Sequence, residues 1–538
     1  MFISKRAKFT LLAFALPLVI TSSCVRYHPK APKLPQAEHW KTDFEKTEAP
    51  HACPQPEKMK YDTLNPWWQV FNDAQLNALQ EKAVNNSPTI QLAFYKLQEA
   101  KAVYLAERSY LFPVVDLNTV ANRSRFSRSN TSSSLQQNSA TNVPAATNPL
   151  LPTSKRGREI SDNGVPTSPN QIPTSSPNIP AAIPASTSAP VTSTATSNPY
   201  RTFLQVLPQV SYELDIWGKY AQGAQAAYMN EKEVQEALHT AHLLLTTTLA
   251  QNYFQLRAAD EDLRILSRVT AIYETQVQLQ TDLFYSGLSP ETNLLQVKAA
   301  LAAAQADYEE TQNSRQILEN SIATLLGESA STFRLEKAAF DPQFPDLRAC
   351  LPADVLLTRP DVRQSKLNVE EFRLLVGVAK TAFFPDITLS GAAGFQSNRA
   401  NTLFDWKNRV LSATVAVTEN LFAGGKTSAD LQAAKARYRQ SVANYINTIL
   451  TAYQEVEDAL FAVKARLKQH AFRTEEFKNY KDYATLTQDQ YQAGLVTYFF
   501  VITADQQALT SARENNTSNL EKVLAHIALI KSLGGSWI

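Results

Sequence analysis

Apolar residues recur along residues 426–493 at the spacing of one face of a helix. Between Leu431 and Leu467 their mean spacing is near 3.6 residues, and the segment contains neither Gly nor Pro. The stripe consists of Leu431, Ala434, Tyr438, Val442, Tyr445, Ile449, Ala452, Val456, Leu460, Val463 and Leu467. A narrow stripe of this kind is typical of a helix packed against other helices. We therefore predict one helix of about 68 residues, roughly 100 Å long.

A second segment, 219–286, predicts a helix of equal length, because Gly223 is its only Gly or Pro residue. Both long helices end at a Gly-Leu pair and are followed by segments that again lack Gly and Pro. These return segments, 291–326 and 495–533, are shorter than the long helices. The pattern predicts two helical hairpins whose tips lie at Gly287 and Gly494.

Two further helices are predicted at 88–112 and 361–384. Each ends at a Phe-Pro pair, because proline cannot continue a helix and disfavours the helical state of the residue before it. One of these helices and one return segment together nearly equal the length of a long helix. We therefore expect the two shorter helices of each copy to stack end to end beside the long one.

Short segments with period-two alternation lie between the helices. Two of them follow the Phe-Pro pairs and two precede the long helices, so strands are predicted at 113–121, 203–214, 386–395 and 410–418. Apolar positions such as Val115 and Leu117, or Ile387 and Leu389, alternate with other residues in these segments. The chain thus supplies four strands of about ten residues, the length of a tilted membrane-spanning strand.

These elements form an internal repeat. Phe112 recurs as Phe384, an offset of 384 − 112 = 272, which also carries Glu99 onto Glu371. Gly218 recurs as Gly425, an offset of 425 − 218 = 207 that holds without insertion through Gly327 and Gly534. Because the first offset is larger than the second, the first copy holds an insertion. Residues 122–202, rich in Ser, Thr, Asn and Pro, are predicted to form an external loop of low complexity.

The N-terminus has the pattern of a secretory signal over 1–23. Basic residues precede an apolar core, and small residues lead to Cys24. This resembles a bacterial lipoprotein box, which would make Cys24 the acylated N-terminus, carrying for example palmitate; a plain cleaved signal is the alternative. Cys53 and Cys350 could form a disulfide in an oxidising compartment or stay as separate thiols. Beyond the signal the sequence has no apolar run of the length that a membrane-spanning helix needs, so none is expected.

Four strands cannot close a barrel, and eight would leave a lumen filled by side chains. A conducting pore therefore needs at least three chains and twelve strands. The expected fold class is an α+β membrane protein, in which a trimeric twelve-stranded transmembrane β-barrel, with four strands per chain, continues into a long α-helical periplasmic tunnel. Net charge is +2 with acids and bases interspersed, so no nucleic-acid partner is expected.

Several motifs resemble the outer-membrane factor family of export channels, and specifically the lipoprotein branch that serves resistance-nodulation-division efflux pumps. They are Trp67-Trp68 with Phe71, the segment Ser211 to Gly218, Leu351-Pro352 with Arg359-Pro360-Asp361-Val362, Gly377-Val378-Ala379, Phe383-Phe384-Pro385, Glu455 to Leu460 and Leu533 to Trp537. The resemblance implies a homotrimer, a periplasmic adaptor (membrane fusion protein) docked on the helical tips, and an inner-membrane transporter of the resistance-nodulation-division type. It implies a lipid-anchored protein in the outer membrane of a Gram-negative bacterium, extending into the periplasm.

The resemblance also divides the chain. Residues 24–87 are expected to form the lipidated segment and part of an equatorial region, and 328–359 a linker in that region. The first strand-helix repeat is 88–327 and the second is 360–538.

The same resemblance places two functional regions. The adaptor-docking tips are Gly287, Leu288 and Ser289 together with Gly494, Leu495, Val496 and Thr497. At the periplasmic constriction, where relatives often carry an acidic ring, this chain has Thr503 and Asn293; Asp505 lies about half a turn further round, and Phe499 one turn nearer the tip. We hypothesise an entrance closed mainly by apolar side chains, with weaker cation selectivity than in relatives.

Other chemistry is disfavoured. The segment Gly424 to Thr427 resembles the end of a phosphate-binding loop, but the first glycine of that motif is replaced by Asn420. His239 and His242 lack a third metal ligand. The acids Glu455, Glu457 and Asp458 are interpreted as a solvated or interhelical charge cluster. We expect no cofactor and no enzyme activity; the alternative function is a structural or adhesive helical surface lipoprotein without a transport role.

Overall fold

The computed structural model describes residues 25–29, 66–125, 200–342 and 359–535. Cys24, Cys53 and Cys350 lie outside these residues, as do 126–199 of the predicted loop. The chain divides into two compact units. One comprises 1–114, 211–390 and 414–538 and contains the α-helices; the other comprises 115–210 and 391–413 and contains most of the strand residues. Each unit draws on both repeats.

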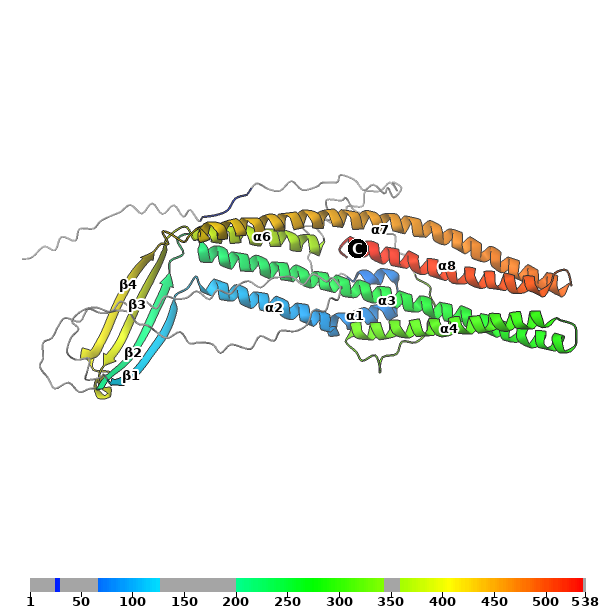
Figure 1. Cartoon of the computed structure of the whole chain (residues 1–538), viewed down its shortest axis with the longest axis horizontal. Helices are drawn as coiled ribbons and strands as arrows, with labels where there is room; N and C mark the ends of the chain where they lie inside the picture. Colours follow the sequence, from blue (N-terminus) through cyan, green and yellow to red (C-terminus); the bar gives the residue numbers. More distant parts are fainter. Residues whose placement is uncertain (1–24, 30–65, 126–199, 343–358, 536–538) are drawn as a thin grey trace, which may run out of the picture. The chain divides into compact units, whose positions relative to one another are not determined.

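The strands form one four-stranded sheet in the order β1-β2-β3-β4. Their bounds are β1 Val114–Arg125, β2 Tyr200–Glu213, β3 Asp386–Ser397 and β4 Arg409–Thr418. Neighbours in sequence are neighbours in the sheet, and the arrows alternate in direction (Figure 1). β1 and β4 are the edge strands. The two repeats therefore share one sheet rather than forming a sheet each.

β1 and β2 extend further than the sequence predicted. β1 continues to Arg125 and β2 begins at Tyr200, so both ends of the predicted loop 122–202 are strand. The guanidinium carbons of Arg123 and Arg125 lie 5.1 and 5.8 Å from the centre of the Tyr200 ring. These cation-π contacts across the strand pair support the additional residues of the ladder. The residues at these strand ends are mostly polar, so the sequence there lacks the alternation of apolar and polar positions that predicts a strand.

The predicted long helices are confirmed as α3 Lys219–Tyr285 and α7 Lys426–Gln492, each of 67 residues. The return helices are α4 Glu291–Leu326 and α8 Tyr498–Ser532. α8 begins later than the predicted start at 495, because Thr497 has an extended backbone at the N-cap position. The helices that precede Phe-Pro are α2 Pro88–Ser109 and α6 Pro360–Thr381. Smaller helices are η2 Trp67–Phe71, α1 Ala74–Asn86, η4 Ala400–Thr402 and η5 Trp406–Asn408.

The predicted stacking of the shorter helices is confirmed in both repeats. α2 and α4 pack on α3, and α6 and α8 pack on α7 (Figure 1). Gly327, at the end of α4, lies so close to the start of α2 that a Cβ there would be 2.8 Å from the Asn86 carbonyl oxygen. In the second repeat, Arg359 at the start of α6 donates a 2.8 Å hydrogen bond to the carbonyl of Ser532 at the end of α8.

The predicted stripe on α7 is buried in its middle but not at its end. Ile449, Val456 and Leu460 are at most 1% exposed, whereas Leu467 is 43% exposed, so its assignment to the packed face is wrong. Beyond Val463 the packed face passes through Arg466 and His470 instead, which contact Glu521 and Ser518 of α8. Ile449 and Ala452 pack with Val362 of α6, whereas Val456, Leu460 and Val463 already pack with α8, so the buried face shifts along α7 while α8 remains its partner.

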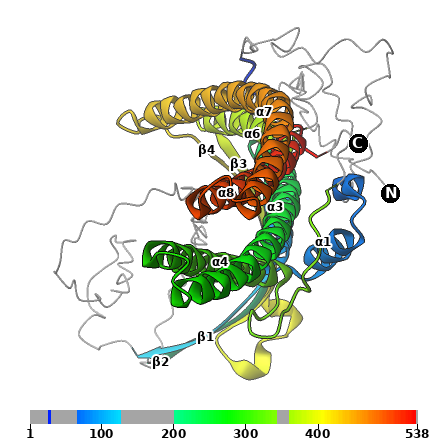
Figure 2. The same ribbon diagram turned by 90° about the vertical axis from the view of Figure 1, so that its right-hand side faces the viewer.

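The aromatic side chains of η2 belong to the largest core cluster. Trp67, Trp68 and Phe71 are each no more than 3% exposed. The rings of Phe71 and Phe254 are 5.0 Å apart, and the Trp67 indole N–H donates to the Thr246 hydroxyl at 3.1 Å. This cluster fixes η2 and α1 against the middle of α3. Figure 2 shows α1 beside α3.

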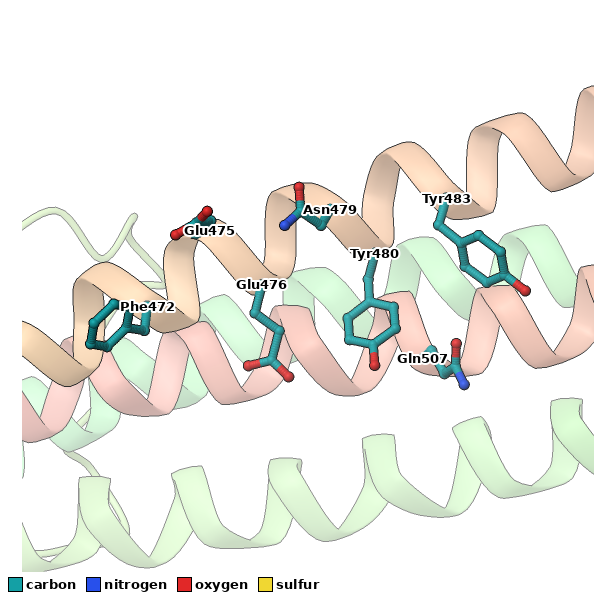
Figure 3. Close-up of a pocket in the computed structure, with 7 residues that line it drawn as sticks. All are labelled: Phe472, Glu475, Glu476, Asn479, Tyr480, Tyr483 and Gln507. Atoms are coloured by element: carbon teal, nitrogen blue, oxygen red, sulfur yellow. The ribbon is translucent and has the colours of Figure 1, made fainter.

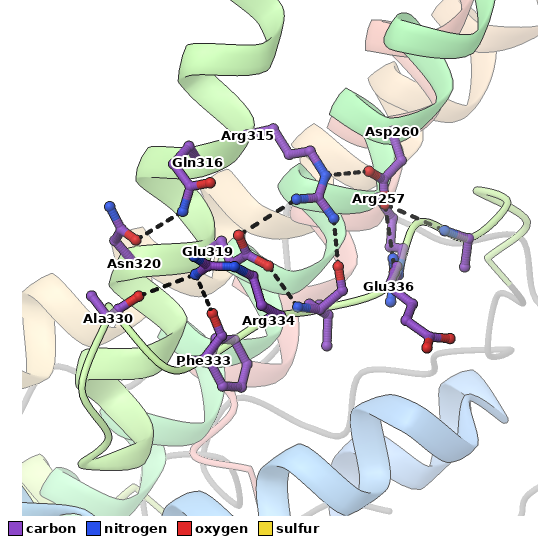
Figure 4. Close-up of polar contacts among 12 residues, drawn as sticks. Arg257, Asp260, Arg315, Gln316, Glu319, Asn320, Ala330, Phe333, Arg334 and Glu336 are labelled. Atoms are coloured by element: carbon purple, nitrogen blue, oxygen red, sulfur yellow. Dashed lines mark hydrogen bonds and ion pairs between the residues drawn. The ribbon is translucent and has the colours of Figure 1, made fainter.

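A buried ion network holds the segment after α4 in place. Arg315 donates to Asp260 at 2.6 Å and to the Leu335 carbonyl at 2.6 Å (Figure 4). Glu319 accepts a 2.5 Å bond from the Leu335 N–H, and Arg257 donates to Asp260 at 2.8 Å. All four charged side chains are buried, so removing any one of them would leave an uncompensated charge in the interior.

No helix among the described residues has the length and apolar character needed to cross a membrane.

Candidate functional site at the helical tips

Both hairpins turn on a glycine in the left-handed region of backbone conformation. Gly287 has φ of 74° and Gly494 has φ of 76°. A Cβ at either position would meet no atom within 4 Å, so the backbone conformation requires glycine there, not a lack of space. The leucines that follow, Leu288 and Leu495, are 76% and 74% exposed. Each tip therefore presents an apolar side chain to solvent on a rigid turn.

The first tip is tied back to its own hairpin by polar side chains. The Ser289 hydroxyl donates to the side-chain oxygen of Gln280 at 2.9 Å, and the Asn293 amide donates to Ser289 at 3.1 Å. Asn293, predicted for the constriction, thus takes part in the turn itself.

Phe499 and Thr503 lie one turn apart at the start of α8. Phe499 is 53% exposed and its ring contacts Phe500, whose centre is 5.7 Å away. The Thr503 hydroxyl donates to the Phe499 carbonyl at 2.9 Å. Phe499 and Phe500 give this turn of α8 an exposed apolar surface.

Asp505 is directed differently from these residues. Its carboxylate accepts a 3.0 Å hydrogen bond from the Gln276 amide on α3, so it joins the two hairpins. Burial raises the pKa of the Asp505 carboxyl, although the bond from Gln276 acts in the opposite direction. The neutral amide of Gln276 compensates the charge of this partly buried carboxylate only weakly.

Asp505 lies next to an apolar cluster between the hairpins. Tyr273 and Val297 of the first hairpin pack there against Tyr498, Val501 and Ile502 of the second. Burial raises the pKa of Tyr273 to about 12, with a contribution from the Asp505 charge, and also raises that of Tyr498. Neither tyrosine hydroxyl has a hydrogen-bond partner among the described residues.

The sequence did not single out Gln276, Tyr273 or Tyr498. A signal was present, since residues 273, 276 and 280 have the spacing of one helical face.

The Gln276–Asp505 contact also shows how the two hairpin tips are aligned with each other. Gln276 precedes Gly287 by as many positions as Asp505 follows Gly494, so the two hairpins are paired with their tips level in sequence.

Most of the remaining candidate residues have partners within the chain. Lys426 pairs with Asp430 one turn further along α7 at 2.7 Å. Glu455 pairs with Arg359 at 2.6 Å, which confirms an interhelical role for this acid. His239 lies 3.2 Å from Glu236, which Arg363 also contacts. Among the described residues no cluster of three or more His, Cys, Asp or Glu side chains is arranged to hold a metal ion.

The residues directly after Cys24 are anchored to helices of both repeats. The Val25 N–H donates to the Trp217 carbonyl at 3.3 Å, and Gln222 of α3 donates to the Val25 carbonyl at 3.3 Å. Arg373 of α6 donates to the Tyr27 carbonyl at 3.1 Å. These contacts hold the start of the described chain at the strand-to-helix turn that precedes α3.

Comparison with known families identifies the chain. The profile of the family described as "Outer membrane efflux protein" matches residues 175–328 and 351–535, which is more than half of the sequence.

Named relatives belong to efflux systems. The chain is 28% identical over 330 residues to the solvent efflux pump outer membrane protein SrpC of Pseudomonas putida, covering 61% of this chain and 70% of that protein. It is 26% identical over 344 residues to the cation efflux system protein CusC of Escherichia coli O6:H1, covering 64% and 74%.

Solved structures share the fold. The outer-membrane channel OprN is similar with a TM-score of 0.75 at 21% identity, covering 96% of this chain and 100% of that one. The CmeC outer membrane channel of Campylobacter jejuni has a TM-score of 0.75 at 22% identity, covering 96% and 95%. The profile match over more than half of the sequence shows that the chain belongs to the outer membrane efflux protein family.

Proposed function

We propose that this protein is the outer-membrane channel of a tripartite efflux system. It conducts passively those substrates that an inner-membrane pump of the resistance-nodulation-division type and a periplasmic adaptor deliver to it. The observation that carries the proposal is the single sheet with two open edges, β1 and β4, to which both repeats contribute. Each repeat leads from this sheet directly into a long helix.

The open sheet edges support a homotrimer. Unpaired edge strands readily pair with another copy, and three copies of a four-stranded sheet make a closed twelve-stranded barrel. Along β4, Leu411, Val415 and Val417 are 82%, 68% and 64% exposed and alternate with Ser or Thr at 412, 414 and 418. Alternation of apolar and polar residues suits a strand with lipid on one face and an aqueous lumen on the other.

The N-terminal contacts support a lipid anchor. Acylated Cys24 would follow from the lipoprotein box, and Val25 is held at the Trp217 turn where β2 leads into α3. An acyl chain on the preceding residue would enter the outer membrane beside the end of the sheet.

The tips are proposed to dock the adaptor and to form the entrance. Leu288 and Leu495 project from the turns Gly287 to Ser289 and Gly494 to Thr497, which form the docking rim. The entrance comprises Phe499, Thr503 and Asn293 on the hairpin surfaces, whereas Asp505 holds the hairpins together through Gln276. The entrance is therefore closed by apolar surfaces and a partly buried hydrogen bond rather than by an exposed acidic ring.

Deletion of the gene in its native bacterium tests the proposal in the cell. We expect hypersensitivity to several unrelated toxic compounds that the wild-type gene, supplied on a plasmid, reverses. Unchanged tolerance to all compounds, together with a loss of surface attachment, would favour an adhesive protein.

A further inference from the structure

Basic side chains gather at one end of the sheet, where β1 and β3 finish and β2 and β4 begin (Figure 1). Residues 121–125, 200–202 and 397–411 contain six bases and one acid, Asp405, so this end carries a net charge of 6 − 1 = +5, compared with +2 for the whole chain. All six bases are exposed, and none makes an ion pair within the described part of the chain. They are Arg123, Arg125, Arg201, Arg399, Lys407 and Arg409.

On the two edge strands these bases continue the exposed apolar face. Because side chains alternate along a strand, Arg123 and Arg125 lie on the same face of β1 as Leu117, which is 66% exposed. On β4, Arg409 shares its face with Leu411, which is 82% exposed. An apolar face that ends in cations suits a strand that passes from hydrocarbon into a layer of anionic headgroups.

The loop between β3 and β4 is held in shape by its own hydrogen bonds. The hydroxyls of Ser397 and Thr402 are 2.8 Å apart, and the Asn408 amide donates to the Thr402 carbonyl at 2.6 Å. Arg409 donates to the Trp406 carbonyl at 2.9 Å, and its guanidinium carbon lies 4.6 Å from the centre of the Trp406 ring. The loop therefore presents a cation and an indole ring in a fixed arrangement.

Aromatic rings are exposed at the same end of the sheet. Phe404 and Trp406 are 68% and 73% exposed, and the Phe404 ring lies 5.7 Å from that of Phe395 on β3. Tyr200 is 45% exposed and contacts both arginines of β1. Arg201 alternates with Tyr200, so it lies on the opposite face of β2 and does not belong to this surface. Exposed rings among cations are typical of the boundary between acyl chains and headgroups.

A groove on α7 offers different chemistry. It has a volume of about 610 Å³, and Phe472, Glu476 and Tyr480 are among the residues that line it (Figure 3). None of the described residues that line it is basic, and Glu476 pairs with Arg473 at 2.6 Å. This carboxylate already has a partner within the chain. The unpaired cations at the end of the sheet are therefore the stronger indication of a ligand.

Closure of the proposed barrel would gather these cations further. β1 and β4 are the edges of the sheet, so Arg409 of one copy would lie at the same barrel end as Arg123 and Arg125 of the next. Like charges repel one another, and an anion between them removes that repulsion. Phosphate suits this role, because arginine forms paired, charge-assisted hydrogen bonds with phosphate oxygens.

We propose that this end of the sheet binds a phosphorylated glycolipid of the outer leaflet, whose phosphate groups contact Arg123, Arg125, Arg399, Lys407 and Arg409. The exposed aromatic rings lie at the level where the sugars of this lipid meet its acyl chains. The inference rests on the proposed function, which places this end of the sheet on the outer side of the membrane, away from the strand ends that lead into the helices.

Lipid binding by the purified full-length protein in non-ionic detergent tests the proposal. The probe is diphosphoryl lipid A, and native mass spectrometry counts the bound lipid and gives its apparent Kd. The triple variant Arg399→Gln, Lys407→Gln and Arg409→Gln should bind lipid A about 100-fold more weakly, which is about fivefold for each cation removed. Its thermal unfolding midpoint should equal that of the wild type, because all three side chains are exposed.

Two further variants separate this surface from a general effect of charge. The matched control removes three exposed lysines of α7, as Lys468→Gln, Lys478→Gln and Lys481→Gln, and should keep the wild-type affinity. Arg399→Lys combined with Arg409→Lys keeps the charge and should retain most of the binding. Equal weakening in the two triple variants would overturn the assigned surface.

The choice of lipid gives the remaining outcomes. Displacement of lipid A by inorganic phosphate, or equal affinity for phosphatidylglycerol, would overturn a glycolipid as the ligand. A trimer that conducts in lipid bilayers but binds no lipid A would overturn the inference and leave the proposed channel intact. A protein that neither forms trimers nor conducts would overturn the channel itself.

Discussion

The side-chain amide of Gln276 donates a hydrogen bond to the carboxylate of Asp505 across the two hairpins, at matching positions behind the two tip glycines. Because the donor is on α3 and the acceptor on α8, the bond breaks whenever the two hairpins separate at this level. The groups around it are apolar side chains and tyrosines. Its strength therefore depends on the protonation state of Asp505.

Replacing Asp505 by Asn should make hairpin pairing independent of pH. Burial raises the pKa of Asp505, so the protonated carboxyl is favoured in the folded state. Its contribution to stability is complete below the ordinary value of 3.8 and is lost as the pH rises through the raised value. Because the paired hairpins close the entrance, the open probability of the wild-type channel should increase with pH across this window. The Asp505→Asn channel should stay closed throughout. Glu291→Gln, at the exposed start of α4, is the control and should keep the wild-type profile.

Replacing Glu371 by Gln should stabilise the protein above neutral pH. Burial and then the charge of Glu233 raise the pKa of Glu371 to about 7. Wild-type stability should thus fall between pH 4.5 and about 7, by up to roughly 3 kcal/mol if the full shift is realised. Thermal unfolding at several pH values should show this fall for the wild type and a flatter profile for Glu371→Gln. Glu370→Gln, which removes a half-exposed partner of Arg373, should leave the slope in place.

Replacing Arg315 by Met should destabilise the helical unit strongly. Arg315 is 8% exposed and compensates both Asp260 and Glu319, so its removal leaves buried charge at a cost of about 3–5 kcal/mol. Arg264→Met removes an exposed pair with Glu261 and should cost less than about 1 kcal/mol. Denaturant unfolding measures both. Equal losses in the two variants would show that the network contributes no more than a surface pair.

Replacing Leu288 and Leu495 by Asp should abolish adaptor binding without affecting the channel. Both side chains are about three-quarters exposed on the tip turns, so the fold does not depend on them. We expect adaptor binding by surface plasmon resonance to weaken at least tenfold, because a carboxylate would be desolvated at an apolar contact. Single-channel conductance of the double variant should equal that of the wild type. An unchanged affinity for the adaptor would show that the adaptor does not bind at the tips.

The helices were predictable because Gly and Pro mark their ends. The two hairpins lack these residues over long segments, and the tip glycines have the backbone conformation that terminates a helix. The constant offset of 207 residues then gave the ends of the hairpin helices in one repeat from those in the other. The strand ends at Arg125 and Tyr200 were missed, because their stabilising contact joins residues that lie on opposite sides of 126–199.

The direction of Asp505 could not be predicted from spacing alone. Counting from Gly494 placed it near the constriction, but its contact with Gln276 depends on how α8 is rotated about its axis against α3. Leu467 illustrates the same limit, since beyond Val463 the contacts of α7 with α8 are made by Arg466 and His470 instead. Periodicity gives the face of a single helix, whereas a site between helices depends on their mutual packing.

Single-channel recording of the purified full-length protein in planar lipid bilayers, with Phe499→Ala measured beside it, tests the central claim most directly. The wild type should insert as a trimer and conduct, with long closed periods, weak cation selectivity and an open probability that increases on Phe499→Ala. A purified trimer that never conducts, in the wild type or in Phe499→Ala, would contradict a channel function.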